Sequence, residues 1–568
     1  MRESEGSSSP EEPRGGISRR DFLRGTAATA LAAGGAAGVL LDPTLASAAA
    51  VAPKKGGHII EGWSNEIKTF NSMLSSDVYS SLCINMVNDG LLLVDGKGNL
   101  QPSLATAVPS GGSDGNTYTF KLRSGVKWTD GTPLTSDDVL FTYNLIFAPE
   151  YAAVASPRRA DFTKHVESIS APDPQTFVIK TKSTYAPLLY AHSAYPIMPK
   201  HVLGSIPPAQ INTMSYNSAP TVTCGMFKFV SWQKGAQVTL ARNPDYWRGA
   251  PYLDNYVYKV FTSAVDIGNA LKTGEINVGA QLDASQLSSL QTQQGLKVDN
   301  FVTPGFEYLA LNLNPEKPAG KILQDLNVRR ALYYGINRPA MIKSVLFGQG
   351  TNATGVEPPT SWAYDPKATP QYKYNPAKAN KMLDAAGWVK GADGVRAKDG
   401  VRMSFKLEAS AGNLTLSNVM QVVQQNWKQI GVEATPTEVQ FTQLVTKLTA
   451  TRDFDIILIG FSLGVDPDQS QLFSAEGLGV GGFNGMDFND ATVNRLDEEG
   501  TSTLNKQKRI QIYKQYQDRM NEEVPILLLY FTKGAYGVLN SVHGMQLNTF
   551  QQYVRPWMNK VWVSSGSS

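Results

Sequence analysis

The sequence has few of the residues that mark metal or redox chemistry. It holds two cysteines and five histidines in 568 residues. The histidines, at positions 58, 165, 192, 201 and 543, show no spacing typical of metal ligands. We therefore expect neither a protein-bound metal nor a cofactor. The two cysteines, Cys83 and Cys224, leave two alternatives open, one disulfide or two small buried thiols.

The sequence also lacks a strong excess of charge. Lysine and arginine number 52 against 49 aspartates and glutamates, which gives a net charge of +3. The charges are spread evenly along the chain, without the basic patch of a nucleic-acid-binding domain. Hydrophobic residues make up 42% of the chain, which is typical of a globular protein. We therefore expect no nucleic-acid partner.

Long apolar runs are absent apart from one Ala/Gly-rich stretch at residues 25–41, which is poor in large side chains. It follows Ser18-Arg19-Arg20-Asp21-Phe22-Leu23-Arg24, which matches the twin-arginine export signal. Small residues at 46–48 suit signal peptidase, so we predict that residues 1–48 are a signal peptide cleaved after Ala48. No cysteine lies near that point, so no lipoprotein anchor is expected. The alternative is a basic pair that simply precedes a core helix.

The rest of the chain reads as alternating strands and helices, which indicates α/β sheets, and it is long enough for two or three cores. Its most informative stretch is residues 118–146. Tyr118–Leu122 alternates apolar and polar residues as a half-buried strand does, and Asp130-Gly131 marks a turn. Thr135 or Ser136 can then cap a helix that carries acidic residues in its first turn.

The wording of that stretch, YTFKLRSGVKWTDGTPLTSDDVLF, resembles a signature of the family 5 extracellular solute-binding proteins. These are the oligopeptide, dipeptide and nickel receptors of bacterial ABC importers. A second stretch, VRRALYYGINR at residues 328–338, is similar to another landmark of the family. Its apolar residues fall on one helical face, and we expect Arg329 and Arg330 to point toward solvent.

The resemblance implies an α/β, two-lobed periplasmic-binding-protein-like fold of the large cluster-C type, with a ligand cleft between the lobes. We expect lobe I at residues 49–304, lobe II at 305–527, and a C-terminal return to lobe I at 528–568. The resemblance also implies a monomer that binds its ligand in the periplasm or outside the cell and works with the permease subunits of an ABC transporter.

One pattern in the chain favours an enzyme instead. Residues 460–464, GFSLG, form a G-x-S-x-G sequence directly after an apolar strand, as a serine nucleophile elbow does. Asp466, Asp487 and His543 follow Ser462 in the order that a serine hydrolase uses. Pro467, however, is poorly placed for the helix that must follow the elbow. We therefore expect no catalytic residue, and a secreted hydrolase remains a distant alternative.

The same segment also bears on which class of ligand the protein binds. Peptide-binding members of the family resemble G-W-x-x-D-x-x-[DE]-P here, and that Asp anchors the α-ammonium of the peptide. In this chain Leu463 stands at the acidic position, and a one-residue gap would place Gly464 there. Asp466, in the retained Asp-Pro-Asp, is expected mainly to shape the loop. A buried ammonium without a counter-charge costs several kcal/mol, so either another acid substitutes or the ligand has no amine.

Two sets of residues correspond to these alternatives. The candidate acids are Glu307, at the expected crossing between lobes, and Glu61 or Glu66, near the first strand. For a neutral ligand such as an oligosaccharide, aromatic rings would stack on sugar faces, and the candidates are Trp63, Phe306, Tyr308 and Phe461. We expect a peptide ligand, with an oligosaccharide as the alternative.

Overall fold

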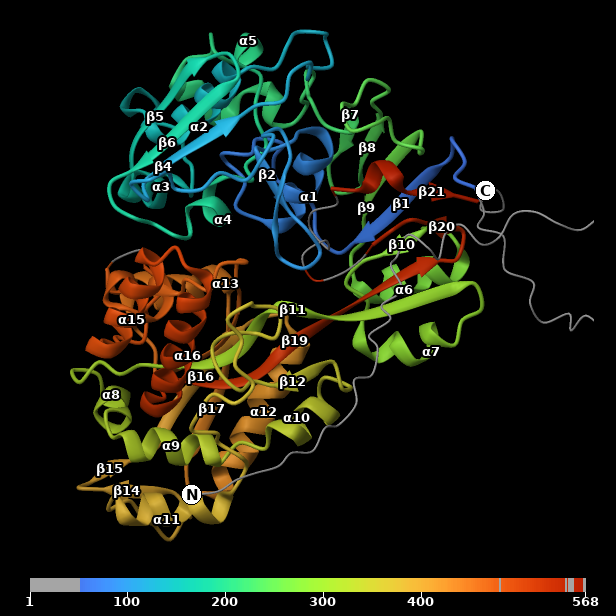
Figure 1. The fold of residues 1–568 in the computed structure, drawn as a ribbon. Coiled ribbons are helices and arrows are strands. Elements are labelled where there is room, and N and C mark those ends of the chain that lie inside the picture. The colour runs from blue at the N-terminus through green and yellow to red at the C-terminus, as the bar shows by residue number, and fades with distance from the viewer. Residues whose placement is uncertain (1–51, 480–481, 547–548, 550–555, 565–568) are drawn as a thin grey trace, which may run out of the picture. The chain divides into compact units, whose positions relative to one another are not determined.

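The computed structural model describes residues 52–479, 482–546, 549 and 556–564 (Figure 1). The chain divides after Ala52, and the second unit, Pro53–Ser568, is compact. The predicted signal peptide lies outside the described residues, so it stays a prediction from the sequence. Within the described part of the chain, no helix combines the length and the apolar character that a bilayer span requires. Everything that follows concerns the second unit.

An eleven-stranded sheet is formed by strands from the beginning, middle and end of the described chain (Figure 1). Its two longest strands, β11 and β19, are antiparallel neighbours. The predicted lobe boundaries after residues 304 and 527 fall inside these strands and not in loops. The path runs β17 (Glu433–Val439), β16 (Ser404–Ser410), β18 (Ile456–Ser462), β11 (Leu296–Leu311), β19 (Ile526–Leu539), β10 (Val278–Gly279), β1 (His58–Trp63), β9 (Asn255–Val260), β8 (Gln237–Arg242), β7 (Phe227–Gln233), with β12 (Gly350–Asn352) beside β19.

The α-helices of five or more residues pack around these strands and around the smaller sheets. They are α1 (Val78–Val87), α2 (Ser136–Phe147), α3 (Arg159–His165), α4 (Leu188–His192), α6 (Ala264–Thr273), α7 (Leu287–Gln291), α8 (Pro318–Leu323), α9 (Leu326–Tyr334), α10 (Arg338–Ser344), α11 (Pro376–Ala385), α12 (Leu414–Gln429), α13 (Phe441–Thr446), α15 (Ala491–Ser502) and α16 (Lys506–Glu523). The largest apolar core packs α9, α12 and α16 against β16, β18 and the second half of β11. A separate core lies around β1 and β7–β9.

The signature stretch folds as the sequence predicts. Its strand β4 (Thr117–Lys121) pairs with β6 (Thr176–Thr181), which also pairs with β5 (Val166–Asp173). Thr135 caps α2 in a capping box, in which the Thr135 backbone N–H donates to Asp138 Oδ2 at 2.9 Å. These elements form a third core of their own, which includes Tyr118 and Phe120.

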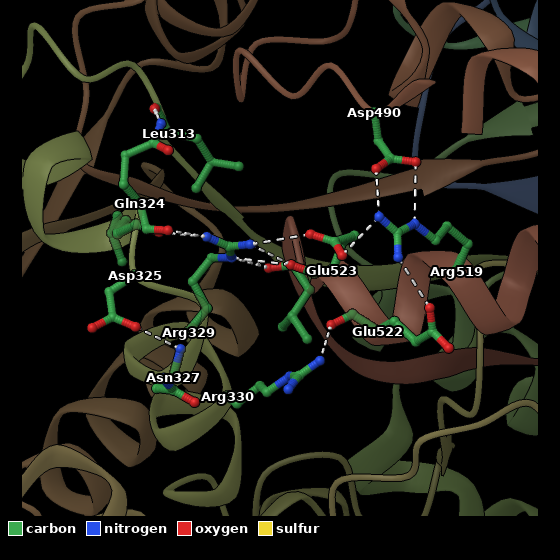
Figure 2. A network of polar contacts seen from close by, with 12 residues as sticks. Leu313, Gln324, Asp325, Asn327, Arg329, Arg330, Asp490, Arg519, Glu522 and Glu523 are labelled. Atoms are coloured by element: carbon green, nitrogen blue, oxygen red, sulfur yellow. Dashed lines mark hydrogen bonds and ion pairs between the residues drawn. The ribbon is translucent and has the colours of Figure 1, made fainter. Parts of the chain in front are cut away.

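The expectation for Arg329 is wrong. Its side chain is only 5% exposed, and its guanidinium donates to backbone carbonyls at the ends of two helices (Figure 2). The acceptors are Leu323 and Gln324 at the end of α8 and Glu523 at the end of α16. Helix C-termini leave carbonyls without intrahelical partners, and a cation there satisfies them and opposes the helix dipole. These carbonyls belong to other helices, so the apolar periodicity of the helix that carries Arg329 could not predict that its side chain is buried.

The cysteine question is settled by the structure. Cys83, on α1, and Cys224 are both buried and both free. Burial raises the pKa of each thiol well above its ordinary value. Of the two alternatives left open by the sequence, the structure shows the pair of buried thiols.

Candidate functional site

A cavity of about 430 Å³ opens where β11 and β18 pair, and we call it the aromatic cavity. Its walls come from the two strands, the end of β16, the start of α12, and α13. It is lined by Thr303, Pro304, Gly305, Phe306, Glu307, Ser410, Asn413, Leu416, Phe441, Leu444, Leu458, Ile459, Gly460, Phe461, Ser462 and Thr532. Most of these residues are apolar, and Glu307 is the ionisable one among them.

The strand register explains why these side chains meet. In the antiparallel pair of β11 and β18, Phe306 lies opposite Phe461, and Glu307 lies opposite Gly460. A β-carbon added at Gly460 would lie only 2.2 Å from Glu307 Oε1, so the glycine provides the space that the carboxylate occupies. A register shift between β11 and β19 falls at Glu307 and Tyr308. Such irregularities re-aim side chains next to functional sites.

Glu307 has no counter-charge among the described residues. Its Oε2 is buried without a hydrogen-bond partner there, and no ion pair reaches the side chain. Burial raises the pKa of the Glu307 carboxyl to about 8, because a charge in an apolar setting is poorly solvated. Burial raises the pKa of the Tyr308 and Tyr530 phenols, and the nearby Glu307 raises both further. A carboxyl in this state can accept a cationic ligand as its missing partner.

Apolar side chains stand exposed around the cavity. Phe441, the first residue of α13, is 58% exposed, and Leu414, at the start of α12, is 75% exposed. Phe483 is 38% exposed and meets Phe461 edge-on, with ring centroids 5.7 Å apart. Exposed apolar surface gathered at a concave site is typical of ligand binding. Phe441 was not predicted as a site residue, because sequence alone does not show whether an aromatic residue at the start of a helix is exposed.

The structure thus brings three of the eight predicted site residues together, namely Phe306, Glu307 and Phe461. Tyr308 is as buried as Phe306 and meets it edge-on, but Tyr308 does not line the cavity. Leu463 lies just past the cavity, where its backbone N–H donates to the Pro304 carbonyl at 2.6 Å.

The remaining three have other partners. Trp63 is fully buried and stacks on Tyr258 at 5.8 Å between ring centroids. Glu66 accepts hydrogen bonds from Trp232 Nε1 at 3.0 Å and from the Gly235 backbone at 2.7 Å. Both oxygens of Asp466 are engaged by Arg509.

Glu61, the other acid considered near the first strand, is fully buried and accepts a hydrogen bond from the Tyr256 hydroxyl at 2.9 Å. Glu61 and Glu66 therefore hold neighbouring strands together, whereas Glu307 faces a cavity.

The geometry around Ser462 is not that of a nucleophile elbow. In an elbow, a helix begins directly after the serine. Here β18 ends at Ser462, and the next helix, α14 (Ser470–Phe473), begins eight residues later. In the described part of the chain, no group of three or more His, Cys, Asp or Glu side chains is placed to hold a metal ion.

Comparison with known proteins decides the family. Residues 99–479 match the sequence model described as "Bacterial extracellular solute-binding proteins, family 5 Middle". The chain belongs to this family. The resemblance seen in the sequence is thereby confirmed. Proteins of this family are periplasmic or extracellular and work with ABC transporter permeases.

Curated relatives cover most of this solute-binding protein. The oligopeptide-binding protein AppA of Bacillus subtilis is 30% identical over 500 residues, which is 87% of this chain and 89% of AppA. The dipeptide-binding protein of Pseudomonas aeruginosa is 26% identical over 499 residues, or 84% of this chain and 89% of that protein.

Solved structures agree. AppA from Bacillus subtilis, in complex with a nonapeptide, superposes with a TM-score of 0.76 at 29% identity, over 90% of this chain and 100% of AppA. NikZ from Campylobacter jejuni, in complex with Ni(L-His), gives a TM-score of 0.75 at 25% identity, over 89% of this chain and 99% of NikZ. The α/β, two-lobed periplasmic-binding-protein fold is therefore confirmed.

Proposed function

We propose that this protein captures peptides with a free amino terminus outside the cytoplasmic membrane and delivers them to an ABC permease. The observation that carries the proposal is the Glu307 carboxyl, which has no counter-charge in the described chain and borders an aromatic cavity. The α-ammonium of a peptide would bind Glu307, and a neighbouring apolar side chain would contact Phe306, Phe441 and Phe461. The resolved AppA–nonapeptide complex supports this ligand class by similarity.

An unpaired carboxyl also distinguishes a peptide from an oligosaccharide. A neutral sugar offers hydroxyl groups but no cation, so Glu307 would keep its proton and form no ion pair. Binding of an ammonium gains that pairing instead, with a charge-assisted hydrogen bond. Glu307 thus takes the role that an acid at position 463 or 464 has in relatives.

Binding does not require chemistry from the protein. A ligand that contacts both lobes stabilises the closed arrangement by the difference in its affinity for the closed and open states. We infer that the protein is a monomer, carries no catalytic group, and leaves the cell through the twin-arginine pathway after removal of residues 1–48. The last inference rests on the sequence around Arg19 and Arg20.

A thermal-shift screen of residues 49–568 against short peptides and oligosaccharides tests the ligand class. A ligand at 100 times its Kd stabilises the folded state by about 2.7 kcal/mol, which is readily seen as a shift in Tm. We expect shifts with free-amine peptides that disappear on N-acetylation. Shifts with oligosaccharides alone, or equal shifts with acetylated peptides, would contradict the proposal.

A further inference from the structure

A second cavity, of about 290 Å³, lies between segments that are far apart in the sequence, and we call it the donor cavity. One wall comes from the signature strand β4, the loop before it and α4. The other comes from the loop at Trp362 and the start of α16. It is lined by Pro109, Ser110, Gly111, Tyr118, Ala186, Leu189, Tyr190, Trp362, Leu504, Lys506 and Arg509. The walls touch directly, since the Ala186 backbone N–H donates to the Thr501 carbonyl at 2.7 Å.

Two hydrogen-bond donors in this lining have no partner among the described residues. Tyr118 is 2% exposed, and its hydroxyl is buried without a hydrogen bond there. The indole Nε1 of Trp362 is likewise buried without an acceptor in that part of the chain. Buried polar groups are nearly always hydrogen-bonded, so two such donors on one cavity call for an acceptor that the described residues do not provide.

Two cationic side chains also line the donor cavity. Lys506 Nζ and Arg509 Cζ lie 5.2 and 5.1 Å from the centroid of the Trp362 ring. Arg509 is neutralised by its ion pair with Asp466, whereas Lys506 forms no ion pair among the described residues. No aspartate or glutamate belongs to the described lining. The unbalanced charge of the lining itself is therefore positive, although Asp114 lies near Tyr118.

The backbone adds to this field. Lys506 is the first residue of α16, an 18-residue helix. A helix of this length carries about half a positive charge at its N-terminus, where the first N–H groups point outward. The Asn505 side chain accepts from the Lys508 backbone N–H at 3.0 Å. The backbone groups of Lys506 and Gln507 belong to the same positive turn.

We propose that the donor cavity binds a carboxylate, held by the Tyr118 hydroxyl, the Trp362 indole and Lys506 at the N-terminus of α16. A carboxylate accepts several hydrogen bonds at once and supplies the missing negative charge. The aromatic rings of Tyr118, Tyr190 and Trp362 accommodate an apolar group attached to it. Because the two walls come from lobe I and lobe II segments, the bound carboxylate favours their contact.

Two sources can supply this carboxylate, a small organic acid or the free carboxyl group of a captured peptide. The site itself does not depend on the peptide proposal, because none of its residues lines the aromatic cavity. For the small-acid source, phenylacetate is a suitable probe, and phenylacetamide is a neutral ligand of nearly the same shape. For the peptide source, the pair is a peptide found in the screen above and its C-terminal amide.

Isothermal titration calorimetry on residues 49–568 tests both pairs at constant ionic strength. We expect a carboxylate to bind at least tenfold tighter than its amide in one pair or both. Lys506→Met and Tyr118→Phe should each remove most of that preference. The matched control is Lys508→Met, because Lys508 is exposed on the same helix but does not line the cavity. For phenylacetate and phenylacetamide, Glu307→Gln should leave the preference intact, which separates this site from the amine site.

Two results would overturn the proposal. In the first, acid and amide bind alike in both pairs. This includes the case in which neither phenylacetate nor phenylacetamide binds and the peptide and its C-terminal amide bind equally well. Alternatively, Lys506→Met and Lys508→Met could reduce the preference equally, which would indicate a general surface charge effect. Thermal unfolding of each variant confirms that it is folded under the conditions of the titration.

Discussion

The Asp466 carboxylate accepts two hydrogen bonds from the Arg509 guanidinium, at 2.7 Å to Nη1 and 2.6 Å to Nη2. The two side chains are only 8% and 5% exposed. Both groups are therefore removed from water, and each depends on the other for its charge balance. Asp466 also lies four residues beyond Ser462, the last residue of β18, so this ion pair fixes the loop that leads away from the aromatic cavity.

Breaking this pair should destabilise the protein strongly. In Asp466→Asn the Arg509 charge stays buried without a counter-charge, which costs about 3–5 kcal/mol in comparable cases. The free energy of unfolding, measured in urea, should fall by that amount. Asp137→Asn is the matched control, because its ion pair with Lys200 is 61% exposed on the acidic side and should contribute less than about 1 kcal/mol. Equal losses in the two variants would contradict the structural role of the pair.

Glu307 should make the stability of the unliganded protein depend on pH. Its folded-state pKa is about 8, above the ordinary value of 4.5, so the folded protein holds the proton more tightly than the unfolded chain. The stability from this group is fully present below about pH 4.5 and is lost as the pH rises through 8. At about 1.4 kcal/mol for each unit between the two pKa values, the loss is roughly 3–5 kcal/mol.

Urea unfolding between pH 4.5 and 8.5 measures this effect in the wild type and in Glu307→Gln. The variant has no carboxyl to ionise, so its stability should fall less over this range by the amount given above. Glu316→Gln, at an exposed position, should behave as the wild type does. Parallel curves for all three proteins would show that Glu307 is not desolvated in solution.

The sequence predicts some of these features and misses others for physical reasons. The capped helix after Thr135 follows from local hydrogen bonding, so the sequence alone shows it. The burial of Arg329 and the ion pair of Asp466 were not predicted, because their partners, Glu523 and Arg509, are far away in the chain. Glu307 was a candidate from its position near the lobe crossing, but only the register against Gly460 shows that its carboxyl faces a cavity.

Gly460 should matter for binding because it leaves room for the Glu307 carboxylate. In Gly460→Ala the new β-carbon would lie 2.2 Å from Glu307 Oε1. The carboxylate must therefore move from its place beside residue 460 of β18. We expect peptide affinity to fall at least tenfold and stability by about 1–3 kcal/mol, as for other overpacked sites. Gly464→Ala is the control, since its nearest atom is 4.0 Å away. Unchanged calorimetric affinity in Gly460→Ala would mean that the ligand does not use this carboxylate.

Export should depend on the arginine pair at positions 19 and 20. Replacing both residues by lysine keeps the charge but removes the twin-arginine signal. We expect the precursor to accumulate inside the cell and the mature protein, beginning after Ala48, to disappear from outside the cytoplasmic membrane. Fractionation with N-terminal sequencing measures both. Normal export of the lysine variant would assign the protein to another pathway.

The most direct test of the central claim counts protons during binding. At pH 6.5 a carboxyl with a pKa of about 8 is protonated, and it must lose that proton to pair with the α-ammonium of a peptide. Calorimetry in buffers of different ionisation enthalpy should therefore show release of about one proton per peptide bound. Glu307→Gln should abolish the release and weaken binding at least thirtyfold, in line with the 2–5 kcal/mol cost of an unpaired buried charge. Binding without proton release, and with equal affinity in Glu307→Gln, would contradict the account.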